Sequence, residues 1–307
     1  MKAMMKTTLC YIENDGKYLM LNRNKKEKDL NEGKWIGIGG KFKVGETPEQ
    51  CLEREVFEET GVRMFSYYFH GIIHFRSDEE TEDMYLYSAY IPNGFKPPEC
   101  NEGTLAWIEK DKIFELPLWE GDKFFLKELI KGTSKIDMTL EYIDGKLVRF
   151  IDHNKALCFT GHKDFEEDYD HLSKRVGIAI EDAYEAGINT FIAGGARGFD
   201  TLAAKEVLKL RNEHKDVRLV LALPFRDQPK VEGDWSSVET NLFYENLKAA
   251  DDVIYVNEID PKAKYHARDR YMVDHSCKVV SYLRRQHSGT GYTVNYAKGK
   301  NREIIFL

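Results

Sequence analysis

Residues 40–62, GKFKVGETPEQCLEREVFEETGV, carry the most informative pattern in the chain. Thr47 is a suitable N-cap, Pro48 suits the first helical position, and Gln50 completes a capping box. Gly61 can end the same helix, because glycine adopts the left-handed conformation without strain. The stretch therefore predicts a loop followed by a helix that begins after Thr47 and ends before Gly61.

Three glutamates of that helix, Glu55, Glu58 and Glu59, stand at positions i, i+3 and i+4. This spacing places their carboxylates on one helical face, where like charges repel. A cluster of oxygen ligands favours a hard cation, which predicts Mg2+, with Mn2+ as the alternative ion. Arg54 can pair with a carboxylate and hold it in place. For the glutamates alone, a solvated acidic helix face is the simpler alternative.

The complete stretch matches the Nudix box, Gx5Ex7REUxEExGU, in which U is a bulky aliphatic residue. The matching positions are Gly40, Glu46, Arg54, Glu55, Val56, Glu58, Glu59, Gly61 and Val62. Residues from roughly 5 to 150 therefore resemble the Nudix family of pyrophosphohydrolases. The resemblance implies an α/β/α sandwich with a mixed sheet, and hydrolysis of a nucleoside diphosphate linked to another group.

The same resemblance implies roles for individual residues. The implied metal ligands are Glu55, Glu58, Glu59 and the Gly40 carbonyl. Arg54 and Glu46 would orient the helix. A carboxylate would take a proton from the attacking water, and Glu55 and Glu102 are the two candidates. Glu102 lies in the loop CNEGTLAWI, where related enzymes place a further catalytic carboxylate, although it could also be a plain loop acid.

Three segments, GKWIGIGGK, NEGTLAWI and PLWEGDKFF, resemble the MutT-type enzymes that remove 8-oxo-dGTP. In those enzymes a Trp and an acidic residue shortly after it line the purine pocket. Trp119 and Asp122 would match these two residues. The alternative is that Trp119 only packs in the core. Lys41 is a further candidate for substrate binding. The mammalian enzyme carries a base-binding Asn where Ile36 stands and a second Asp where Gly121 stands. The predicted substrate is a purine nucleoside triphosphate, oxidised dGTP first, and ADP-ribose or a dinucleotide is the alternative.

Length and composition describe an ordinary globular protein. With 307 residues, 42% hydrophobic and 32% charged, we expect two domains, which we divide into residues 1–153 and 154–307. A formal net charge of −7 argues against broad nucleic-acid binding, which needs a basic surface. The five scattered cysteines predict neither a zinc site nor a disulfide framework.

The N-terminal apolar stretch is too short for a signal peptide, and no apolar run is long enough to span a membrane. We therefore expect a cytoplasmic protein. The sequence leaves association into a homo-oligomer open.

The two halves of the chain differ in pattern. The first is dominated by short strand-like runs, interrupted by helical patterns at about 47–60 and 120–131, and it ends in the predicted hairpin MTLEYIDGKLVRFI. From about residue 156, nearly continuous apolar runs such as ALCFTG, TFIAGGA and RLVLALP alternate with helical patterns, for instance 165–186 and 199–212. That alternation predicts a Rossmann-like, doubly wound parallel sheet.

Ligands of such sheets bind at the carboxyl ends of the strands, where the C-terminal half has two glycine-rich turns. The segments FTGH, GGARGFD, RDRYMVDHS and HSGTGYTVNYA supply the candidate residues Gly161, His162, Gly194, Gly195, Arg197, Gly198, Asp200, Arg268, Arg270, Ser288, Gly289 and Thr290. Glycines allow close backbone approach, free helix N-termini favour phosphates, and arginines can pair with them. Packing alone is the alternative explanation for such turns.

Together these segments resemble the SLOG superfamily, in particular its YpsA-like branch, across about residues 155–307. The resemblance implies a Rossmann-like fold that binds a small nucleotide or nucleotide-derived ligand. Phosphoribohydrolases of this superfamily carry GGxGTxxE, whereas Thr293 stands where their acid would fall. We therefore favour a ligand sensor over an N-glycosidase or an oligomerising role. Asp200 is available as a ribose ligand or catalytic acid.

Overall fold

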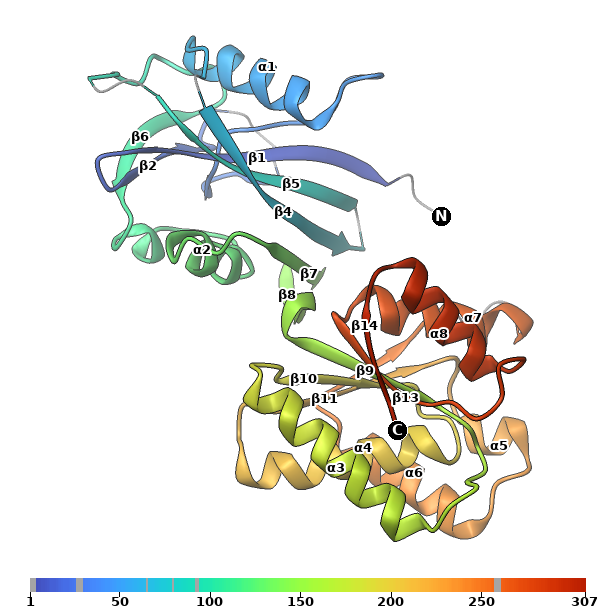
Figure 1. The fold of residues 1–307 in the computed structure, drawn as a ribbon. Coiled ribbons are helices and arrows are strands. Elements are labelled where there is room, and N and C mark those ends of the chain that lie inside the picture. Colours follow the sequence, from blue (N-terminus) through green and yellow to red (C-terminus); the bar gives the residue numbers. More distant parts are fainter. Residues whose placement is uncertain (1–3, 26–29, 65, 79, 92–93, 257–260) are drawn as a thin grey trace. The chain divides into compact units, whose positions relative to one another are not determined.

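The computed structural model describes residues 4–25, 30–64, 66–78, 80–91, 94–256 and 261–307. The chain divides into two compact units, Met1–Phe150 and Ile151–Leu307, whose elements are labelled in Figure 1. The boundary predicted after residue 153 falls within η2 (His153–Lys155), a short 3-10 helix.

The first unit is built on a mixed sheet. Its elements are β1 (Met5–Asn14), β2 (Lys17–Asn22), β3 (Trp35–Ile36), α1 (Pro48–Thr60), β4 (Ser66–Ser77), β5 (Thr81–Tyr90), β6 (Thr104–Glu109), η1 (Ile113–Glu115), α2 (Asp122–Ile130), β7 (Ile136–Ile143) and β8 (Lys146–Asp152). The strand order is β3-β2-β1-β5-β4-β7-β8, and β6 pairs with β2. Strands β1 and β5 are parallel, as are β4 and β7, whereas β2 is antiparallel to its neighbours. The predicted mixed sheet is thereby confirmed.

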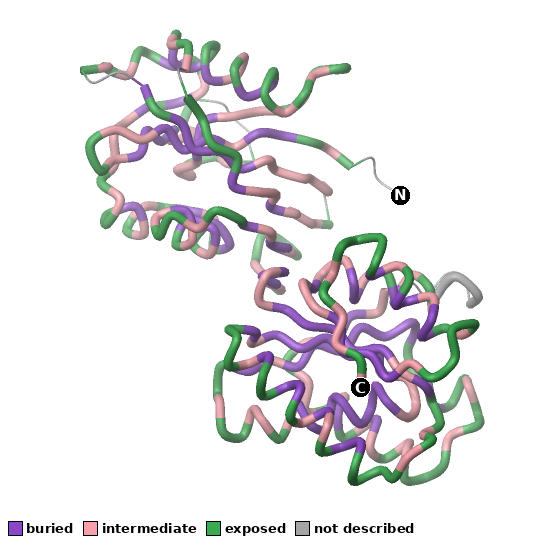
Figure 2. The backbone as a smooth tube through the Cα atoms, viewed as in Figure 1, coloured by how far each residue is buried: buried purple, intermediate pink, exposed green. Residues whose placement is uncertain are grey.

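Alternate residues of β1 supply the two layers of the core in this unit. Cys10 lies in a buried cluster with Leu52 and Val56 of α1. Tyr11 lies in a different cluster, and its ring is 6.3 Å from that of Phe125 in α2. Because successive strand residues point to opposite faces, α1 and α2 cover opposite faces of the sheet (Figures 1 and 2), which is the predicted sandwich.

The caps predicted for α1 are confirmed. The Thr47 hydroxyl accepts a hydrogen bond from the Gln50 backbone at 3.2 Å, and the Gln50 side chain accepts one from the Thr47 backbone at 2.9 Å. Gly61 has a φ of 71° and ends the helix in the left-handed conformation. Fixed ends determine which side chains of α1 face the loop that precedes it.

The second unit is a parallel sheet covered on both faces by helices. Its elements are β9 (Ala156–Gly161), α3 (Tyr169–Glu185), β10 (Thr190–Ala193), α4 (Phe199–Glu213), β11 (Arg218–Leu223), α5 (Gln228–Glu232), α6 (Ser237–Ala249), β12 (Asp252–Tyr255), α7 (Pro261–Asp274), β13 (Lys278–Tyr282), α8 (Gly289–Gly299) and β14 (Glu303–Phe306). Its strand order is β12-β11-β10-β9-β13-β14, and the pairs are parallel. The predicted doubly wound sheet is confirmed.

Helix α3 begins later than the pattern from residue 165 predicted. The Asp168 side chain accepts hydrogen bonds from the backbones of Asp170 and His171, so the helix starts where its cap lies. The layers are again set by alternation along the first strand. Phe159 packs in the cluster of α3 and α4, whereas Cys158 packs in the cluster that includes residues of α7 and α8.

In the described part of the chain, no helix combines the length and the apolar character that crossing a membrane requires.

We expect Phe191→Ala to destabilise the second unit by about 3–5 kcal/mol, the usual cost of removing a buried phenyl ring. Phe191 is fully buried in β10 and stacks near Phe159, with ring centroids 6.3 Å apart. Urea unfolding of the full chain would measure the loss. Val238→Ala is the control because Val238 is 75% exposed, and its unfolding free energy should be almost unchanged. Equal effects of both variants would contradict this core assignment.

Candidate functional site

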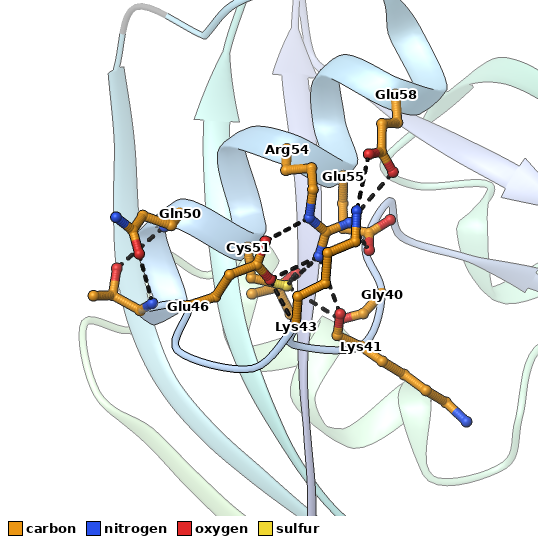
Figure 3. A network of polar contacts seen from close by, with 11 residues as sticks. Gly40, Lys41, Lys43, Glu46, Gln50, Cys51, Arg54, Glu55 and Glu58 are labelled. Atoms are coloured by element: carbon orange, nitrogen blue, oxygen red, sulfur yellow. Dashed lines mark hydrogen bonds and ion pairs between the residues drawn. The ribbon is translucent and has the colours of Figure 1, made fainter.

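The polar face of α1 gathers carboxylates around one arginine (Figure 3). Arg54 Nη1 donates to Glu55 Oε1 at 2.5 Å and lies 3.3 Å from Glu58 Oε2. Lys43 Nζ lies 3.4 Å from Glu58 Oε1. Glu55 and Glu58 therefore lie on the side of the helix that Arg54 occupies, and the positive charge of Arg54 reduces the repulsion between them.

Arg54 also joins the helix to the loop before it. Its Nε and Nη2 donate to the two oxygens of Glu46 at 2.6 and 2.8 Å, and Nη2 donates to the Lys41 carbonyl at 3.1 Å. The hydrogen bonds from Arg54 lower the pKa of Glu46 to about 2. This bidentate ion pair explains how Arg54 and Glu46 can orient α1, the role that the family resemblance implied.

Glu59 is the most deeply buried of the three glutamates. Burial, together with the charges of Glu102 and Glu55, raises the pKa of Glu59 to about 8. Among the described residues, its Oε2 atom has no hydrogen-bond partner. A buried carboxylate with an unused oxygen beside two more carboxylates suits a bound cation, since a cation would supply the missing partner and the missing charge.

Gly40 lies directly against this cluster. A Cβ atom at position 40 would be 2.5 Å from the Glu55 carboxylate. The Gly40 carbonyl accepts the backbone N–H of Thr8 at 2.9 Å, so the predicted additional metal ligand also anchors the loop to β1. Only glycine leaves room for Glu55 in this position.

Glu102 reaches the same cluster from the loop before β6. Its carboxylate forms an ion pair with Arg23, at the end of β2. The charge of Glu102 contributes to the raised pKa of Glu59, which places the two carboxylates within electrostatic reach of each other. The structure therefore brings a carboxylate from a distant loop to the glutamates of α1.

A cavity of about 500 Å3 extends from this cluster into the unit. Gly40, Glu55 and Glu102 line its carboxylate end. Its apolar lining comes from Leu9, Ile36, Phe75, Met84 and Trp119, and its other polar lining includes Asn31, Lys41 and Asp122. The cavity thus joins an aromatic and aliphatic wall to a group of carboxylates.

Trp119 is fixed by polar and aromatic contacts. Its Nε1 donates to Asn31 Oδ1 at 2.8 Å, and its ring makes an edge contact with Tyr142 at 5.5 Å. Lys34 Nζ lies 5.2 Å from the centre of the Trp119 ring. Trp119 therefore packs against the core and also lines the cavity.

Asp122 is the first residue of α2 and is buried at the cavity wall. Burial raises its pKa to about 7, and the charge of Lys34 opposes that shift. Its carboxyl can accept hydrogen bonds when ionised and can also donate one when protonated.

In the second unit, the turn between β10 and α4 surrounds a buried ion pair. Arg268 Nη1 lies 3.6 Å from Asp200 Oδ2 and donates to the Gly194 carbonyl, while Nε donates to Asp269 at 2.8 Å. Burial raises the pKa of Asp200 to about 6, although Arg268 lowers it. Ala196 donates its backbone N–H to Asp200 at 3.3 Å. Both charged groups are about 95% buried, and these contacts are all within the second unit.

The glycines of this turn are required by contacts within the protein. A Cβ at Gly194 would be 2.2 Å from the Arg268 guanidinium, and one at Gly198 would be 2.1 Å from the Lys163 carbonyl. Gly195 and Gly198 also have positive φ values of 66° and 83°. Gly161 follows the same rule, since its Cβ would overlap Phe199. The packing explanation accounts for these four glycines.

The second glycine-rich turn lies beside the end of β9. His162 Nε2 accepts the backbone N–H groups of Arg284 and Arg285 at 3.0 and 3.1 Å, which joins the loops that follow β9 and β13. Burial, and then the charge of Arg285, lowers the pKa of His162, so the ring stays a neutral acceptor. Ser288 caps α8 through the Gly291 N–H, and space around Gly289 is open. Thr290 is buried in the first turn.

The remaining predicted arginines of this unit bind other side chains. Arg197 lies 3.3 Å from Asp164 and 3.5 Å from Glu239. Arg270 donates to the Tyr292 hydroxyl at 3.0 Å, between α7 and α8. Arg270 therefore contacts α8, the helix that begins in the second glycine-rich turn.

Comparison with known proteins follows the two units. The NUDIX domain family matches residues 4–129, and the YspA SLOG family (YpsA) matches residues 154–304. The oxidized purine nucleoside triphosphate hydrolase of Danio rerio is 34% identical over 117 residues, which cover 38% of this chain and 72% of that protein. The chain is a Nudix hydrolase with a SLOG domain.

Other relatives are similar to parts of this Nudix–SLOG chain. The prophage-derived protein YoqJ of Bacillus subtilis, which is uncharacterized, is 35% identical over 120 residues, covering 35% of this chain and 68% of its own length. A MutT protein from Bacillus halodurans of known crystal structure is 26% identical, with a TM-score of 0.43, and covers 48% of this chain and 95% of its own.

Sequence reasoning missed several residues of the Nudix cavity. Arg23 pairs with Glu102, Asn31 accepts from Trp119, and Glu82 lines the wall formed by β5. Each is a single polar residue without a local motif, and each meets its partner across a long stretch of sequence. Glu82 also stands in the acidic run DEETED, where no spacing singles it out.

We expect Gly40→Ala to impair the Nudix site without unfolding the domain. The new Cβ would displace the Glu55 carboxylate, which is the end of a flexible side chain, so activity should fall on the order of a hundredfold. The unfolding free energy should change by less than about 1 kcal/mol. Hydrolysis and urea unfolding measure the two effects.

Gly39→Ala is the matched control. Its Cβ would be 1.9 Å from the Thr8 backbone carbonyl, which cannot move away easily. This variant should lose about 1–3 kcal/mol of unfolding free energy or more. Unchanged hydrolysis by a folded Gly40→Ala variant would contradict the contact between position 40 and Glu55.

We expect Asp122→Asn to alter how stability depends on pH. Between pH values of about 4 and 7 the folded chain keeps a proton on Asp122 that the unfolded chain has lost. Since the folded state then binds more protons, the contribution of Asp122 to stability falls as pH rises through this window. The free energy of unfolding of the variant, minus that of the natural chain, should therefore be larger at about pH 8 than at about pH 5. Urea unfolding at both pH values measures this, and a constant difference would refute the buried position of the carboxyl.

Proposed function

We propose that the Nudix domain hydrolyses purine nucleoside triphosphates, oxidised dGTP first, to the monophosphate and pyrophosphate. The observation that carries the proposal is the single cavity that Trp119, Asp122 and Glu55 line together. An aromatic surface suits a base, a carboxyl suits the polar edge of that base, and a cation cluster suits the phosphates. The named substrate class of the Danio rerio relative supports the same assignment.

Mg2+, or Mn2+ in its place, would be held by Glu55, Glu58 and Glu59, with the Gly40 carbonyl as a further ligand. The unused Oε2 of buried Glu59 supports this assignment, because all-oxygen ligand sets favour such ions. When bound, the ion would neutralise the phosphates and activate water for attack on phosphorus. Arg54 would hold Glu55 in position, as it does in the structure.

The proton of the attacking water would pass to Glu55 or Glu102. Both line the cavity, and each pairs with an arginine, Arg54 and Arg23 respectively. Lys41 lines the cavity next to Gly40 and would add positive charge beside the phosphates. Arg23 would serve the same purpose, since its guanidinium already lies against a carboxylate of this site.

The base would stack on Trp119 and meet the Asp122 carboxyl. Ile36 contributes an apolar wall, so it cannot make the hydrogen bond of the asparagine that the mammalian enzyme carries there. Asn31 lines the same cavity and is oriented by the Trp119 N–H, so we assign the amide contact with the base to Asn31.

For the SLOG domain we propose binding of a second, small nucleotide-like ligand. The strand order places β9 between β10 and β13, so the connections run in opposite directions from β9. In doubly wound sheets, ligands bind in the crevice at such a reversal. The loops that meet at His162, and the open space at Gly289, lie at this place. The buried, internally paired Asp200 supports a binding role in preference to a catalytic one.

The test of the Nudix proposal is a product-release assay with Mg2+ on the full chain. Its substrates are 8-oxo-dGTP, the common nucleoside triphosphates, ADP-ribose and dinucleoside polyphosphates. Preference for 8-oxo-dGTP with pyrophosphate release would support the proposal. Preference for ADP-ribose or a dinucleotide would overturn the substrate and favour degradation of a signalling nucleotide that the SLOG domain senses.

We expect Glu58→Gln and Glu59→Gln each to lose at least roughly a hundredfold in hydrolysis, since a metal ligand supports several kcal/mol of transition-state stabilisation. Mn2+ affinity, measured by electron paramagnetic resonance, should fall in parallel. Glu53→Gln is the matched control because Glu53 is exposed on α1, outside the i, i+3, i+4 set. Near-normal Mn2+ affinity in folded Glu59→Gln would disprove the proposed metal site.

A further inference from the structure

Glu82 is a carboxylate of the Nudix cavity to which the proposed reaction gives no role. It is the second residue of β5, and it lines the cavity together with Thr7 and Met84. The Thr7 hydroxyl donates to Glu82 Oε1 at 2.5 Å, which fixes the side chain. Among the described residues, Glu82 Oε2 accepts no hydrogen bond, and this atom is not sealed from the cavity. It is therefore available to a ligand in the cavity.

The strand register locates Glu82 relative to the proposed base site. In the parallel pair of β1 and β5, Thr7 lies opposite Met84 and Met5 lies opposite Glu82. Glu82 and Met84 point to the same face, with Cα atoms about 6–7 Å apart, because two residues separate them along a strand. A base in contact with Met84 would therefore lie close enough to Glu82 for its sugar to reach the Glu82 carboxylate.

Lys41, which we propose to lie beside the phosphates, is also close to Glu82 in the cavity. The Lys41 backbone is bridged to Thr7, next to Glu82. Burial raises the pKa of Glu82, and the hydrogen bond from Thr7 and then the positive charge of Lys41 oppose that rise. Thr7, which orients Glu82, lies between Met84 and Lys41, and Glu82 lines the same cavity as both. A nucleotide with its base on the Met84 wall and its phosphates at Lys41 would have its sugar between these two, within the part of the cavity that Thr7 and Glu82 line.

A carboxylate in a pocket for a polyanion needs a specific reason. Uncompensated, it would repel the phosphates and weaken binding. It becomes favourable when it accepts a hydrogen bond from the ligand, and on the sugar the only such donors are hydroxyl groups. The alternative is that Glu82 only completes the contact with Thr7, in which case the sugar would not matter.

We propose that Glu82, oriented by Thr7, accepts a hydrogen bond from the 3′-hydroxyl of the nucleotide and so selects free nucleotides with an unsubstituted 3′ position. A phosphate on that oxygen, as at the 5′ end of an RNA chain, would meet the Glu82 carboxylate and be repelled. This inference rests on the proposed function, because it assumes that a nucleotide base occupies the wall of Met84 and Trp119.

The experiment compares kcat/KM of the full chain for dGTP, 2′,3′-dideoxy-GTP and a guanosine dinucleotide with a 5′-triphosphate. We expect dGTP to exceed the dideoxy compound by roughly ten- to a hundredfold, the usual effect of a hydrogen bond to a charged group. The dinucleotide should be turned over more slowly still. In Glu82→Gln the dideoxy ratio should fall several-fold, and the dinucleotide should gain relative to dGTP because the repelling charge is gone.

Glu53→Gln is the control, since Glu53 is an exposed carboxylate of the same domain outside the cavity lining, and its dideoxy ratio should match that of the natural chain. Equal turnover of dGTP and dideoxy-GTP by the natural chain would overturn the inference while leaving the proposed function standing. Absence of hydrolysis of every nucleoside triphosphate would instead overturn the proposed function. Because the first comparison uses no variant, a folding defect in Glu82→Gln cannot obscure the result.

Discussion

The pair between Arg54 and Glu46 is the constraint on which the Nudix site depends. Like-charged groups on one helical face repel, and burial of Glu59 adds a further cost. Arg54 offsets part of that cost and, through two hydrogen bonds to Glu46, ties α1 to the loop that carries Gly40. The loop must approach so closely that only glycine fits at position 40. One guanidinium therefore fixes both the spacing of the carboxylates and the distance between loop and helix.

Local signals explain how much of this arrangement the sequence could predict. Thr47, Gln50 and Gly61 act within one turn of themselves, so their positions define both ends of α1 before any tertiary contact is known. The spacing of Glu55, Glu58 and Glu59 then determines a common face. Strand and helix alternation in the second unit is equally local, which is why its parallel sheet was predictable. The start of α3 was not, because the cap at Asp168 follows an acidic stretch with several candidate caps.

The unpredicted part of the site consists of contacts across long sequence separations. Arg23 with Glu102, and Asn31 with Trp119, meet only because β2, β6 and the start of α2 converge on one cavity. A lone arginine or asparagine has no periodicity, so nothing in the sequence distinguishes it from a surface residue. The glycine-rich turn at Gly194 shows that even a clear local pattern does not reveal which groups surround it in the fold. Its glycines suggested space for a ligand, but the nearby space is occupied by the protein's own Arg268.

The two domains therefore use buried charge in different ways. In the SLOG domain, Asp200 pairs with Arg268 and accepts the backbone N–H of Ala196, so contacts within the fold offset part of the cost of its burial. In the Nudix domain, the Oε2 atom of buried Glu59 has no hydrogen-bond partner among the described residues, so its burial is not compensated by the protein alone. Groups kept in such a state destabilise the fold unless a ligand completes them. That difference is the physical reason why we propose the chemistry for the Nudix cavity and a binding role for the SLOG domain.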